Sequence, residues 1–315
     1  DILIIGGSLS GSSTALQILR RKPKTRICIV EKSTTFSRRV GESTVEVGAY
    51  FLGKHLGLTA HLDQKHIAKQ GLRFHFANEK TEHLRECGEI GPGYNVRMPS
   101  YQIDRAVLDE EMLSRAETAG ATVRRGWKVR EVELCEGEQQ STRCEAEGIA
   151  SQILTAKWIV DASGRATVIG RKLGLIEPNK EHPISAVWAR FRGVLNWEEY
   201  GRLPRNAKWA ERTHGLRGTA TNHLMGDGYW IWMIPLASGE TSVGVVYDER
   251  IVSFPTKGPL EERLVDFIRK HPAGKDLLAR AEIVEGDLHH RRKLSYRATQ
   301  FAGNGWVLVG DAAGF

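Results

Sequence analysis

The sequence has 315 residues, 41% hydrophobic and 26% charged, which is ordinary for a globular chain with a large core. Its formal net charge of +7 comes from 45 basic and 38 acidic residues that are mostly scattered, so we expect no nucleic-acid partner. No apolar run reaches the length of a membrane span, and the four cysteines lack metal-ligand spacing. These features predict no membrane span, no metal, and a reducing, cytoplasmic location.

The chain opens with the pattern of a nucleotide-binding strand, turn and helix. Residues 2–5 are apolar, as in a buried parallel strand, and a glycine-rich turn and an amphipathic helix follow. Gly6, Ser8 and Gly11 occupy the GxGxxG positions, with serine in place of the middle glycine. Such a turn lets a pyrophosphate approach the helix N-terminus, and Glu31, 20 residues after Gly11, is placed to accept from ribose hydroxyls. The alternative is a tight strand–helix turn without a ligand.

Two segments before residue 80 contain residue types suited to a site. Residues 40–46 read Val-Gly-Glu-Ser-Thr-Val-Glu, and form either a site loop or a surface loop that caps the next helix. Residues 68–74 read Ala-Lys-Gln-Gly-Leu-Arg-Phe. Strand alternation from there predicts one face with Leu72, Phe74 and Phe76, and an opposite face with Lys69, Arg73 and His75. A lone lysine on a strand is most often solvated.

The middle of the chain continues the first lobe. Residues 106–119 predict a helix that Gly120 ends. Residues 122–134 and 143–153 predict a β-hairpin, and residues 158–165 a strand that enters a turn.

The second half predicts a sheet. Strands are expected at residues 184–195, 228–235 and 241–246, and a helix at residues 260–270. Residues 196–222 are expected to be rich in loops and to border a substrate entrance. Within the second strand, Trp230, Trp232 and Ile234 share one face, which periodicity alone assigns to a sheet core.

The chain closes on a second glycine-rich motif. Residues 307–309 are apolar and lead into Gly-Asp-Ala-Ala-Gly at residues 310–314, an acidic loop suited to holding the ribityl arm of a flavin. A flavin bound between two such motifs predicts an enzyme of redox or oxygen chemistry.

The chain resembles the glutathione-reductase-type FAD proteins, and within them the flavin-dependent halogenases. The halogenase features are the WxWxIP match at residues 230–235, the GE(A/S)T match at residues 41–44, and the segment around Lys69. Ser8 and Glu46 depart from the family pattern, since many members have a proline at the latter position. The expected fold is α/β, with a Rossmann-like FAD-binding lobe and a mostly antiparallel β-sheet substrate lobe.

The resemblance implies FAD as cofactor, reduced by a separate flavin reductase. It implies Lys69 as the catalytic residue and Trp230 and Trp232 as a wall that shields the flavin. The implied cofactor-binding residues are Gly6, Ser8, Ser10, Gly11, Glu31, Glu42, Ser43, Arg105, Asp311 and Gly314. Reduced FAD, oxygen and chloride or bromide would yield hypohalous acid, and Lys69 would present the halogen to a small aromatic or phenolic substrate, either free or carrier-bound.

Three other functions fit parts of the same pattern. An aromatic hydroxylase would transfer oxygen directly and reduce its own flavin, but the tryptophan wall and Lys69 disfavour it. A geranylgeranyl-reductase-like enzyme would need membrane affinity, and no amphipathic anchor is visible. A flavoprotein without turnover remains open because of Ser8 and Glu46.

The expected domain organisation is discontinuous. Residues 1–66, 101–180 and 288–315 are assigned to the FAD-binding lobe, and residues 67–100 and 181–287 to the substrate lobe. The last residue falls just after a motif, so we expect a further C-terminal part.

Overall fold

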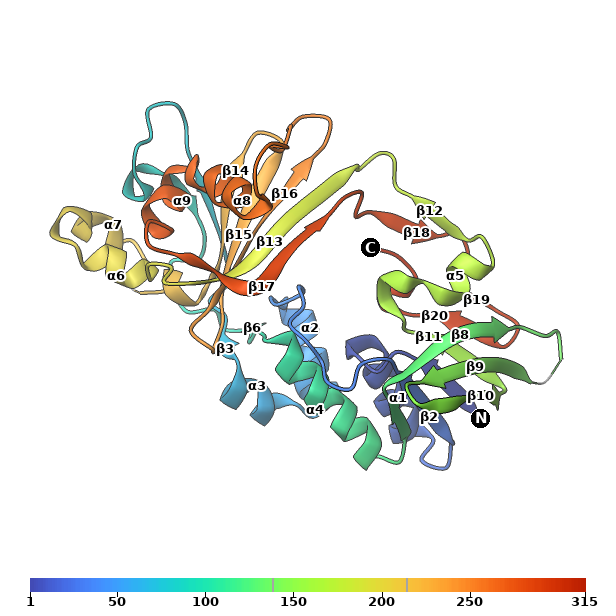
Figure 1. Cartoon of the computed structure of the whole chain (residues 1–315). Coiled ribbons are helices and arrows are strands. Elements are labelled where there is room, and N and C mark those ends of the chain that lie inside the picture. The colour runs from blue at the N-terminus through green and yellow to red at the C-terminus, as the bar shows by residue number, and fades with distance from the viewer. Residues whose placement is uncertain (138, 214) are drawn as a thin grey trace. The chain divides into compact units, whose positions relative to one another are not determined.

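The computed structural model describes residues 1–137, 139–213 and 215–315, which form two compact units (Figure 1). Unit 1 comprises Asp1–Arg38, Arg105–Lys180 and Ser295–Phe315, and unit 2 comprises Arg39–Asp104 and Glu181–Leu294. Both units are discontinuous in sequence. The bounds differ from those expected at three places. Residues 39–66, 101–104 and 288–294 were assigned to the FAD-binding lobe but group with unit 2.

Unit 1 is built on a six-stranded sheet in the order β19-β20-β11-β1-β2-β7. Only the β19–β20 pair is antiparallel. The strands are β1 (Ile2–Ile5), β2 (Ile27–Glu31), β7 (Thr122–Arg125), β11 (Trp158–Asp161), β19 (Ala302–Gly303) and β20 (Trp306–Leu308). The apolar runs that predict buried parallel strands therefore form the centre of this sheet.

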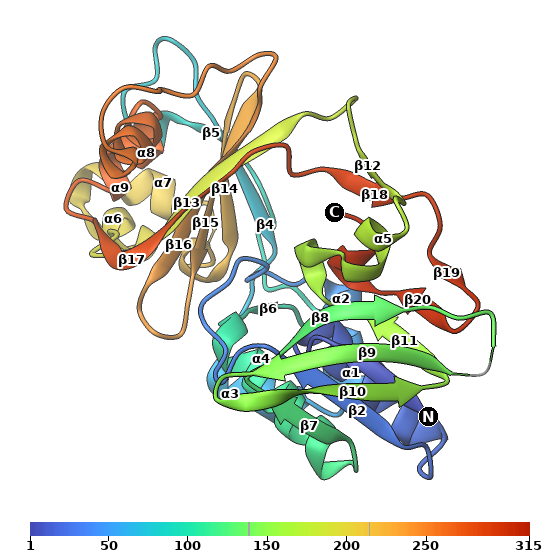
Figure 2. The same cartoon turned by 45° about the vertical axis from the view of Figure 1, so that its right-hand side comes forward.

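Each face of that sheet is covered. Helices α1 (Leu9–Arg21) and α4 (Arg105–Thr118) pack on one face, where Ile4, Leu19 and Leu113 share a core cluster. On the other face lies a three-stranded antiparallel sheet (Figure 2). Its strands are β8 (Trp127–Glu133), β9 (Gln140–Ala146) and β10 (Ile149–Ala156). The unit also contains α5 (Val168–Lys172), β12 (Ile176–Pro178) and β18 (Tyr296–Ala298).

The predicted hairpin of residues 122–134 and 143–153 is wrong in two places. Its first half is divided at Gly126, which has φ +75°, so β7 joins β2 in the large sheet while β8 turns away. Its second half is divided at Gly148, with φ +71°, which makes β9 and β10 separate antiparallel strands. Glycine adopts these left-handed conformations at little steric cost, so each marks a turn.

Unit 2 is built on a seven-stranded sheet in the order β17-β13-β16-β15-β14-β4-β5. Only the β14–β4 pair is parallel, so the mostly antiparallel sheet is confirmed. The strands are β4 (Leu72–Phe76), β5 (Gly88–Ile90), β13 (Ile184–Arg192), β14 (Thr221–Gly226), β15 (Tyr229–Pro235), β16 (Thr241–Asp248) and β17 (Glu282–Arg291). A short antiparallel pair joins β3 (Ile67–Ala68) to β6 (Tyr101–Gln102).

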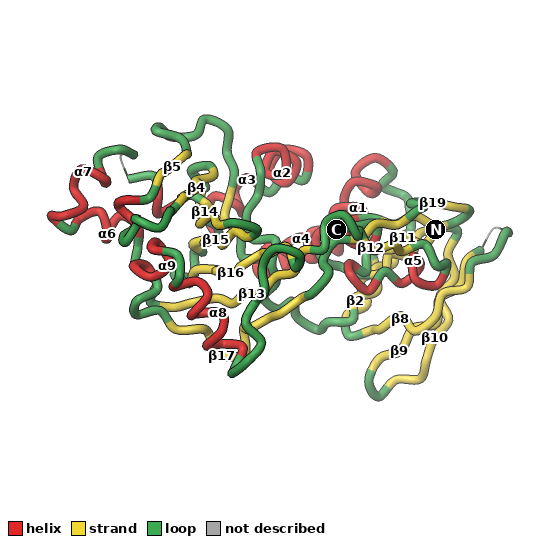
Figure 3. The backbone as a smooth tube through the Cα atoms, turned by 90° about the horizontal axis from the view of Figure 1, so that it is seen from above, coloured by secondary structure: helices red, strands yellow, loops and turns green. Residues whose placement is uncertain are grey.

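The main core of unit 2 lies on one face of this sheet. Ile231, Met233 and Val245 point into it and meet Leu264 and Phe267 of α8 (Leu260–Arg269). Figure 3 shows the helices in red and the strands in yellow. The helices of the unit are α2 (Glu46–Tyr50), a π-turn (Phe51–His55), α3 (Thr59–Lys65), α6 (Trp197–Arg202), α7 (Ala207–Ala210), α8 (Leu260–Arg269) and α9 (Pro272–Leu277).

The segment 196–222, in its described residues 196–213 and 215–222, has more regular structure than predicted. It contains α6 and α7, and its aromatic side chains Trp197, Tyr200 and Trp209 are buried in the main core. Asn196 caps α6 by accepting from the backbone N–H of Glu198. Because the segment is rich in glycine and charged residues, the sequence pattern did not indicate that these aromatic side chains pack against the sheet.

Candidate active site

The glycine turn after β1 has the close backbone packing that a nucleotide-binding turn needs. Gly6 has φ +98°, and a Cβ at that position would lie 2.5 Å from the carbonyl oxygen of Ala162. A Cβ on Gly11 would lie 1.9 Å from the carbonyl oxygen of Gly6. The helix therefore starts directly against the turn, and its first N–H groups, which have no intrahelical partner, face the space beyond the strand.

Ser8 takes part in this turn through its side chain. Its hydroxyl donates to Asp109 Oδ2 at 2.6 Å and accepts from Arg105 Nη2 at 3.3 Å. Arg105 and Asp109 also form a salt bridge one turn apart on α4. The serine that replaces the middle glycine thus ties the turn to α4 and holds the predicted site residue Arg105 beside it.

Glu31 lies at the carboxyl end of β2 with only 3% of its surface exposed. Its Oε2 accepts from the backbone N–H of Gly7 at 2.8 Å, and its Oε1 accepts from the backbone N–H of Ser33 at 2.9 Å. Each carboxylate oxygen can accept a second hydrogen bond, so both retain acceptor capacity. Glu31 consequently fixes the glycine turn and is still able to bind a hydroxyl donor.

The two glycine-rich motifs from opposite ends of the chain meet in unit 1. Gly310 has φ +59°, and a Cβ there would lie 2.1 Å from Ser10 Oγ. Asp311 follows in a 3-10 turn, and its backbone carbonyl oxygen accepts from Tyr296 Oη at 2.5 Å. The sequence prediction that both motifs belong to one lobe agrees with this contact.

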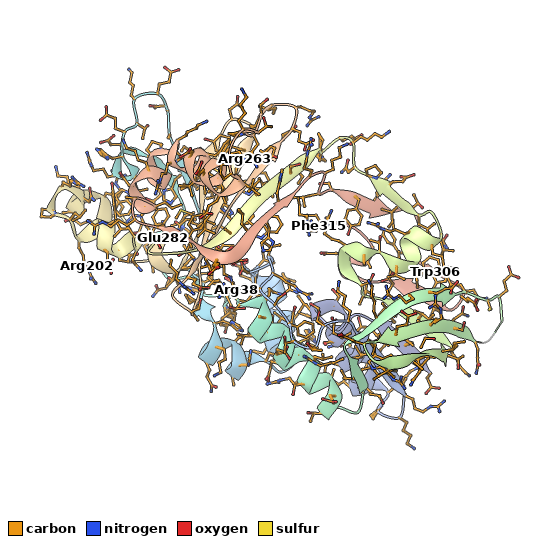
Figure 4. The ribbon with its side chains drawn as sticks, in the orientation of Figure 1. Arg38, Arg202, Arg263, Glu282, Trp306 and Phe315 are labelled. Carbon is orange, nitrogen blue, oxygen red and sulfur yellow. The ribbon has the colours of Figure 1, made fainter. Side chains whose placement is uncertain are left out.

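The last residues are also held in place. Gly314 forms an antiparallel bridge with Arg297, and Phe315 exchanges two backbone hydrogen bonds with Tyr296. The Arg165 guanidinium lies over the rings of Tyr296 and Phe315, the latter labelled in Figure 4. These contacts keep the acidic loop next to the first glycine turn.

The residues of unit 1 fit an FAD molecule. A turn in which neither Gly6 nor Gly11 has room for a Cβ brings the backbone close to the position of a pyrophosphate. Arg105 adds a cation beside that turn, and Glu31 adds the buried acceptor for a ribose hydroxyl. The individual roles of these residues toward FAD remain predictions.

In unit 2, the loop at residues 41–44 is held as an extra strand. The backbone N–H of Thr44 donates to the Tyr101 carbonyl oxygen at 2.9 Å, and that of Ile103 donates to the Glu42 carbonyl oxygen at 2.7 Å. Because β6 also pairs with β3, three segments distant in sequence lie side by side. This pairing is the reason that residues 39–66 and 101–104 group with unit 2.

The side chain of Glu42 is buried in an ionic network rather than free. Arg190 of β13 donates to Glu42 Oε1 from Nε at 3.0 Å and from Nη2 at 2.6 Å, and its Nη1 reaches Asp104 at 2.8 Å. Burial raises the pKa of Glu42, against the opposing effects of Ser242 and Arg190. Arg190 was not singled out by the sequence, because it lies 148 residues from its partner.

Lys69 directly follows β3 and is only 4% exposed. Its Nζ donates to Ser43 Oγ at 3.0 Å and to the Thr44 carbonyl oxygen at 2.7 Å. Burial lowers the pKa of Lys69, and the Glu46 carboxylate partly opposes that shift. In the described part of the chain, no carboxylate forms an ion pair with this lysine. Lys69 and Ser43, both predicted site residues, are therefore in direct contact.

The predicted faces of the lysine segment need correction. Lys69 does not share a strand face with Arg73 and His75, since Gly71, at φ +75°, interrupts the chain before β4. Arg73 and His75 point into the protein, while Leu72 is partly exposed. The charge of Arg73 is met by Glu89, which also binds a second buried guanidinium at Arg217.

The aromatic strand forms part of a row that crosses unit 2. Strand register places Phe74, His223, Trp232, Gly244 and Trp188 side by side, from β4 to β13. The rings of the first two stack at 5.3 Å, and the two indoles lie 6.4 Å apart across the glycine. The row lies on the sheet face opposite the main core.

Trp230 lies on the same face as Trp232, as predicted, and both are partly buried against a smaller cluster with Trp188. Trp232 Nε1 donates to Ser242 Oγ at 3.1 Å. Whether the two tryptophans shield the flavin stays a prediction. Sequence analysis missed His223, whose pKa is lowered to about 4 by burial and by the charge of Lys69.

Gly244 is the position on which the aromatic row depends. A Cβ there would lie 2.3 Å from Trp232 Cζ2 and 2.5 Å from Trp188 Cβ. We expect Gly244→Ala to displace the indoles and to lower the free energy of unfolding by about 1–3 kcal/mol. Urea unfolding of the variant measures this, with Gly93→Ala as control because a Cβ on Gly93 meets nothing within 4 Å. Equal stability of both variants would contradict this role for Gly244.

A family model described as "FAD binding domain" matches residues 1–200 of this chain. The chain belongs to this family. Its cofactor is FAD, in agreement with the glycine turn, and the α/β fold predicted from the sequence is confirmed. No helix in residues 1–137, 139–213 and 215–315 is long and apolar enough to cross a membrane.

Curated relatives of the chain are flavin-dependent halogenases. The chain is 29% identical to flavin-dependent halogenase chlA of Dictyostelium discoideum, over 99% of this chain and 55% of that protein. It is 27% identical to flavin-dependent halogenase armH5 of Armillaria mellea, over 100% of this chain and 59% of that protein. The chain thus spans somewhat more than half the length of these relatives.

Solved structures have the same fold. The myxobacterial chondrochloren halogenase CndH is similar with a TM-score of 0.81 and 28% identity, over all of this chain and 68% of that one. Halogenase PltM, determined in complex with phloroglucinol and FAD, is similar with a TM-score of 0.83, 20% identity and 64% coverage of that chain. At that identity, the second likeness supports the fold alone.

Proposed function

We propose that this chain provides the FAD-binding and lysine-bearing parts of a flavin-dependent halogenase that acts on an aromatic or phenolic substrate. The observation that carries the proposal is Lys69, a buried lysine with a lowered pKa and without an ion-pair partner in the described part of the chain. Burying an ammonium group without a carboxylate is unfavourable, and such lysines are typical of reaction sites. Halogenase relatives that match along this chain support the same reaction class.

When bound in its reduced form, FAD would supply two of the four electrons that oxygen takes up, and chloride or bromide would supply the other two as it becomes hypohalous acid. The role of the protein is to bind hypohalous acid at Lys69. As an ammonium, Nζ donates a hydrogen bond to the oxygen of hypohalous acid and polarises the O–halogen bond. As a free amine, Nζ forms an N–halogen bond while hydroxide leaves, takes up the amine proton and departs as water.

Transfer to the substrate follows from either form. The aromatic ring supplies the electron pair of the new carbon–halogen bond, and the ring carbon then loses its proton. Water competes for the electrophile, so the surroundings of Lys69 must be dry. The low exposure of Lys69 meets this need.

Partners follow from this chemistry. A separate flavin reductase delivers reduced FAD, and a halide ion is the second reactant. Two relatives are named as a chlorinase and a brominase of a pyrrole carried on a peptidyl carrier protein. We propose either a free phenol or a carrier-bound aromatic acyl group as the substrate class.

The test uses the full-length protein with a flavin reductase, FAD, oxygen and bromide, and a phenol panel as acceptor. We expect monobrominated products with the bromine isotope pattern in mass spectra. Catalase is added so that free peroxide does not brominate the phenols. Oxygen insertion with NAD(P)H and no bromination would contradict the proposal and indicate an aromatic hydroxylase instead.

A further inference from the structure

A chain of hydrogen bonds extends from Lys69 into the interior of unit 2. Lys69 Nζ lies 3.0 Å from Ser43 Oγ, which lies 2.7 Å from Thr221 Oγ1, which lies 3.0 Å from Gln102 Oε1. Thr221 and Gln102 are buried, and four separate segments contribute one residue each. No sequence motif indicated Thr221 or Gln102.

The direction of every bond in this chain is fixed. The Gln102 amide is oriented by its Nε2, which donates to the Thr219 carbonyl oxygen at 3.4 Å, so its Oε1 only accepts. Thr221 must spend its single hydroxyl proton on that oxygen, and therefore accepts from Ser43. Ser43 in turn has no proton left for Lys69 and presents it with a lone pair.

Lys69 Nζ is thereby held at two of its three hydrogen-bonding positions. One N–H is directed at Ser43 Oγ and another at the Thr44 carbonyl oxygen, 2.7 Å away. Both acceptors lie on the segment that pairs with β6, so their spacing is set by backbone hydrogen bonds. No third hydrogen bond of Nζ occurs among residues 1–137, 139–213 and 215–315, so one N–H is available to an external group.

We propose that Ser43 and Thr221 are positioning residues for Lys69. The chain of hydrogen bonds from Lys69 through Ser43 and Thr221 to Gln102, here called the relay, orients Nζ so that its third N–H is directed at the reacting halogen species. The proposal rests on the proposed function of Lys69. In the described part of the chain Thr221 forms no hydrogen bond with Lys69, so its polar effect on the amine passes through the orientation of the Ser43 hydroxyl. Hydrogen-bonded hydroxyls in series also polarise one another, which makes Ser43 a better acceptor.

Two other ionisable groups act on Lys69. Glu46 of α2 favours its charged form, and the pKa of His223 on β14 is lowered by the lysine charge. The lowered pKa of His223, about 4, leaves it neutral at pH 7, so it adds no opposing charge. Thr221 therefore differs from other buried threonines of the chain in one respect: its hydroxyl is connected to Lys69 by hydrogen bonds through Ser43.

The experiment compares Thr221→Val, which keeps the side-chain shape, with Thr221→Ser, which keeps the hydroxyl. The pKa of Lys69 is followed by NMR in protein labelled at lysine Cε, with Lys69→Arg to assign the signal. We expect Thr221→Val to lower this pKa by up to about one unit, because the ammonium loses a well-oriented acceptor. Thr221→Ser should restore the original value.

Turnover gives the second readout. We expect Thr221→Val to lower kcat about tenfold with KM nearly unchanged, and to shift the pH profile of kcat to lower pH with the Lys69 pKa. Thr142→Val is the control, since Thr142 is a buried threonine of unit 1 whose hydroxyl has no hydrogen-bond partner in the described part of the chain. It should change neither quantity.

The two proposals fail in different ways. If Thr221→Val leaves both the Lys69 pKa and kcat unchanged, the relay is overturned and halogenation stands. If the pKa shifts as expected while no variant and no wild-type protein halogenates, the relay's hold on Lys69 stands and the proposed function falls.

Discussion

Replacing Lys69 with methionine is expected to lower the rate of halogenation by roughly 10²–10⁴-fold or more, the range associated with losing a positioned catalytic group. Methionine matches the length of the lysine side chain without its amine, and fits the same buried position without a charge to desolvate. The fold should therefore persist, and most of the FAD affinity should be kept because the glycine turn, Glu31 and Arg105 lie in unit 1 and do not include Lys69. Product formation by mass spectrometry and FAD affinity by fluorescence titration measure both expectations.

The same variant separates halide oxidation from halogen transfer. Without Nζ, hypohalous acid has no group that holds it, so we expect oxygen consumption to continue while the acid escapes or peroxide is released. Monochlorodimedone detects the escaped acid, and a peroxide assay detects the remainder. Lys54→Met serves as control, because Lys54 is an exposed lysine of the same unit. Normal halogenation by Lys69→Met would remove this lysine from the mechanism.

Local patterns predicted the elements of unit 1 well. The apolar run of β1, the glycine spacing and the position of Glu31 depend on neighbouring residues, and the structure has them in the expected order. The grouping of the two glycine-rich motifs in one unit was predictable as well, because each motif independently indicated a flavin. Where a glycine divided a strand, as at Gly148, the hydrophobic pattern continued across the turn and concealed it.

The site in unit 2 was predictable only as separate pieces. Lys69 and Ser43 were singled out by motif. Their contact arises because β3, which precedes Lys69, and the segment that contains Ser43 both pair with β6, and β6 belongs to neither motif. Arg190 lies on β13 and Thr221 on β14, and each pairs with a residue more than a hundred positions away. Such contacts are set by sheet register, and a single sequence does not reveal which strands are neighbours.

Replacing Glu31 with alanine is expected to weaken FAD binding at least tenfold and to lower the free energy of unfolding by about 2–4 kcal/mol. The stability change follows because the buried backbone N–H of Gly7 and the half-buried N–H of Ser33 lose their acceptor, at about 1–3 kcal/mol for the buried group and less for the other. The change in affinity follows from the loss of the acceptor placed for a ribose hydroxyl. Isothermal titration with FAD and urea unfolding give the two values.

A loss of affinity could arise from a distorted turn alone, and Asp161 provides the matched control. Asp161 is a buried carboxylate at the end of β11 that also accepts from two backbone N–H groups, those of Ser163 and Ile169. Asp161→Ala should therefore destabilise unit 1 by a similar amount. An equal loss of FAD affinity in both variants would contradict a direct contact by Glu31.

If only Glu31→Ala loses FAD affinity, the Glu31 carboxylate has two roles: it holds the glycine turn and it binds the ribose. Its oxygens already hold the backbone of the glycine turn, and their second lone pairs are the ones left for a ligand. Turn geometry and ribose recognition would then be coupled, so that FAD binding strengthens the same contacts that shape its site. Bound FAD should accordingly raise the melting temperature of the wild-type protein and of Asp161→Ala, but much less that of Glu31→Ala.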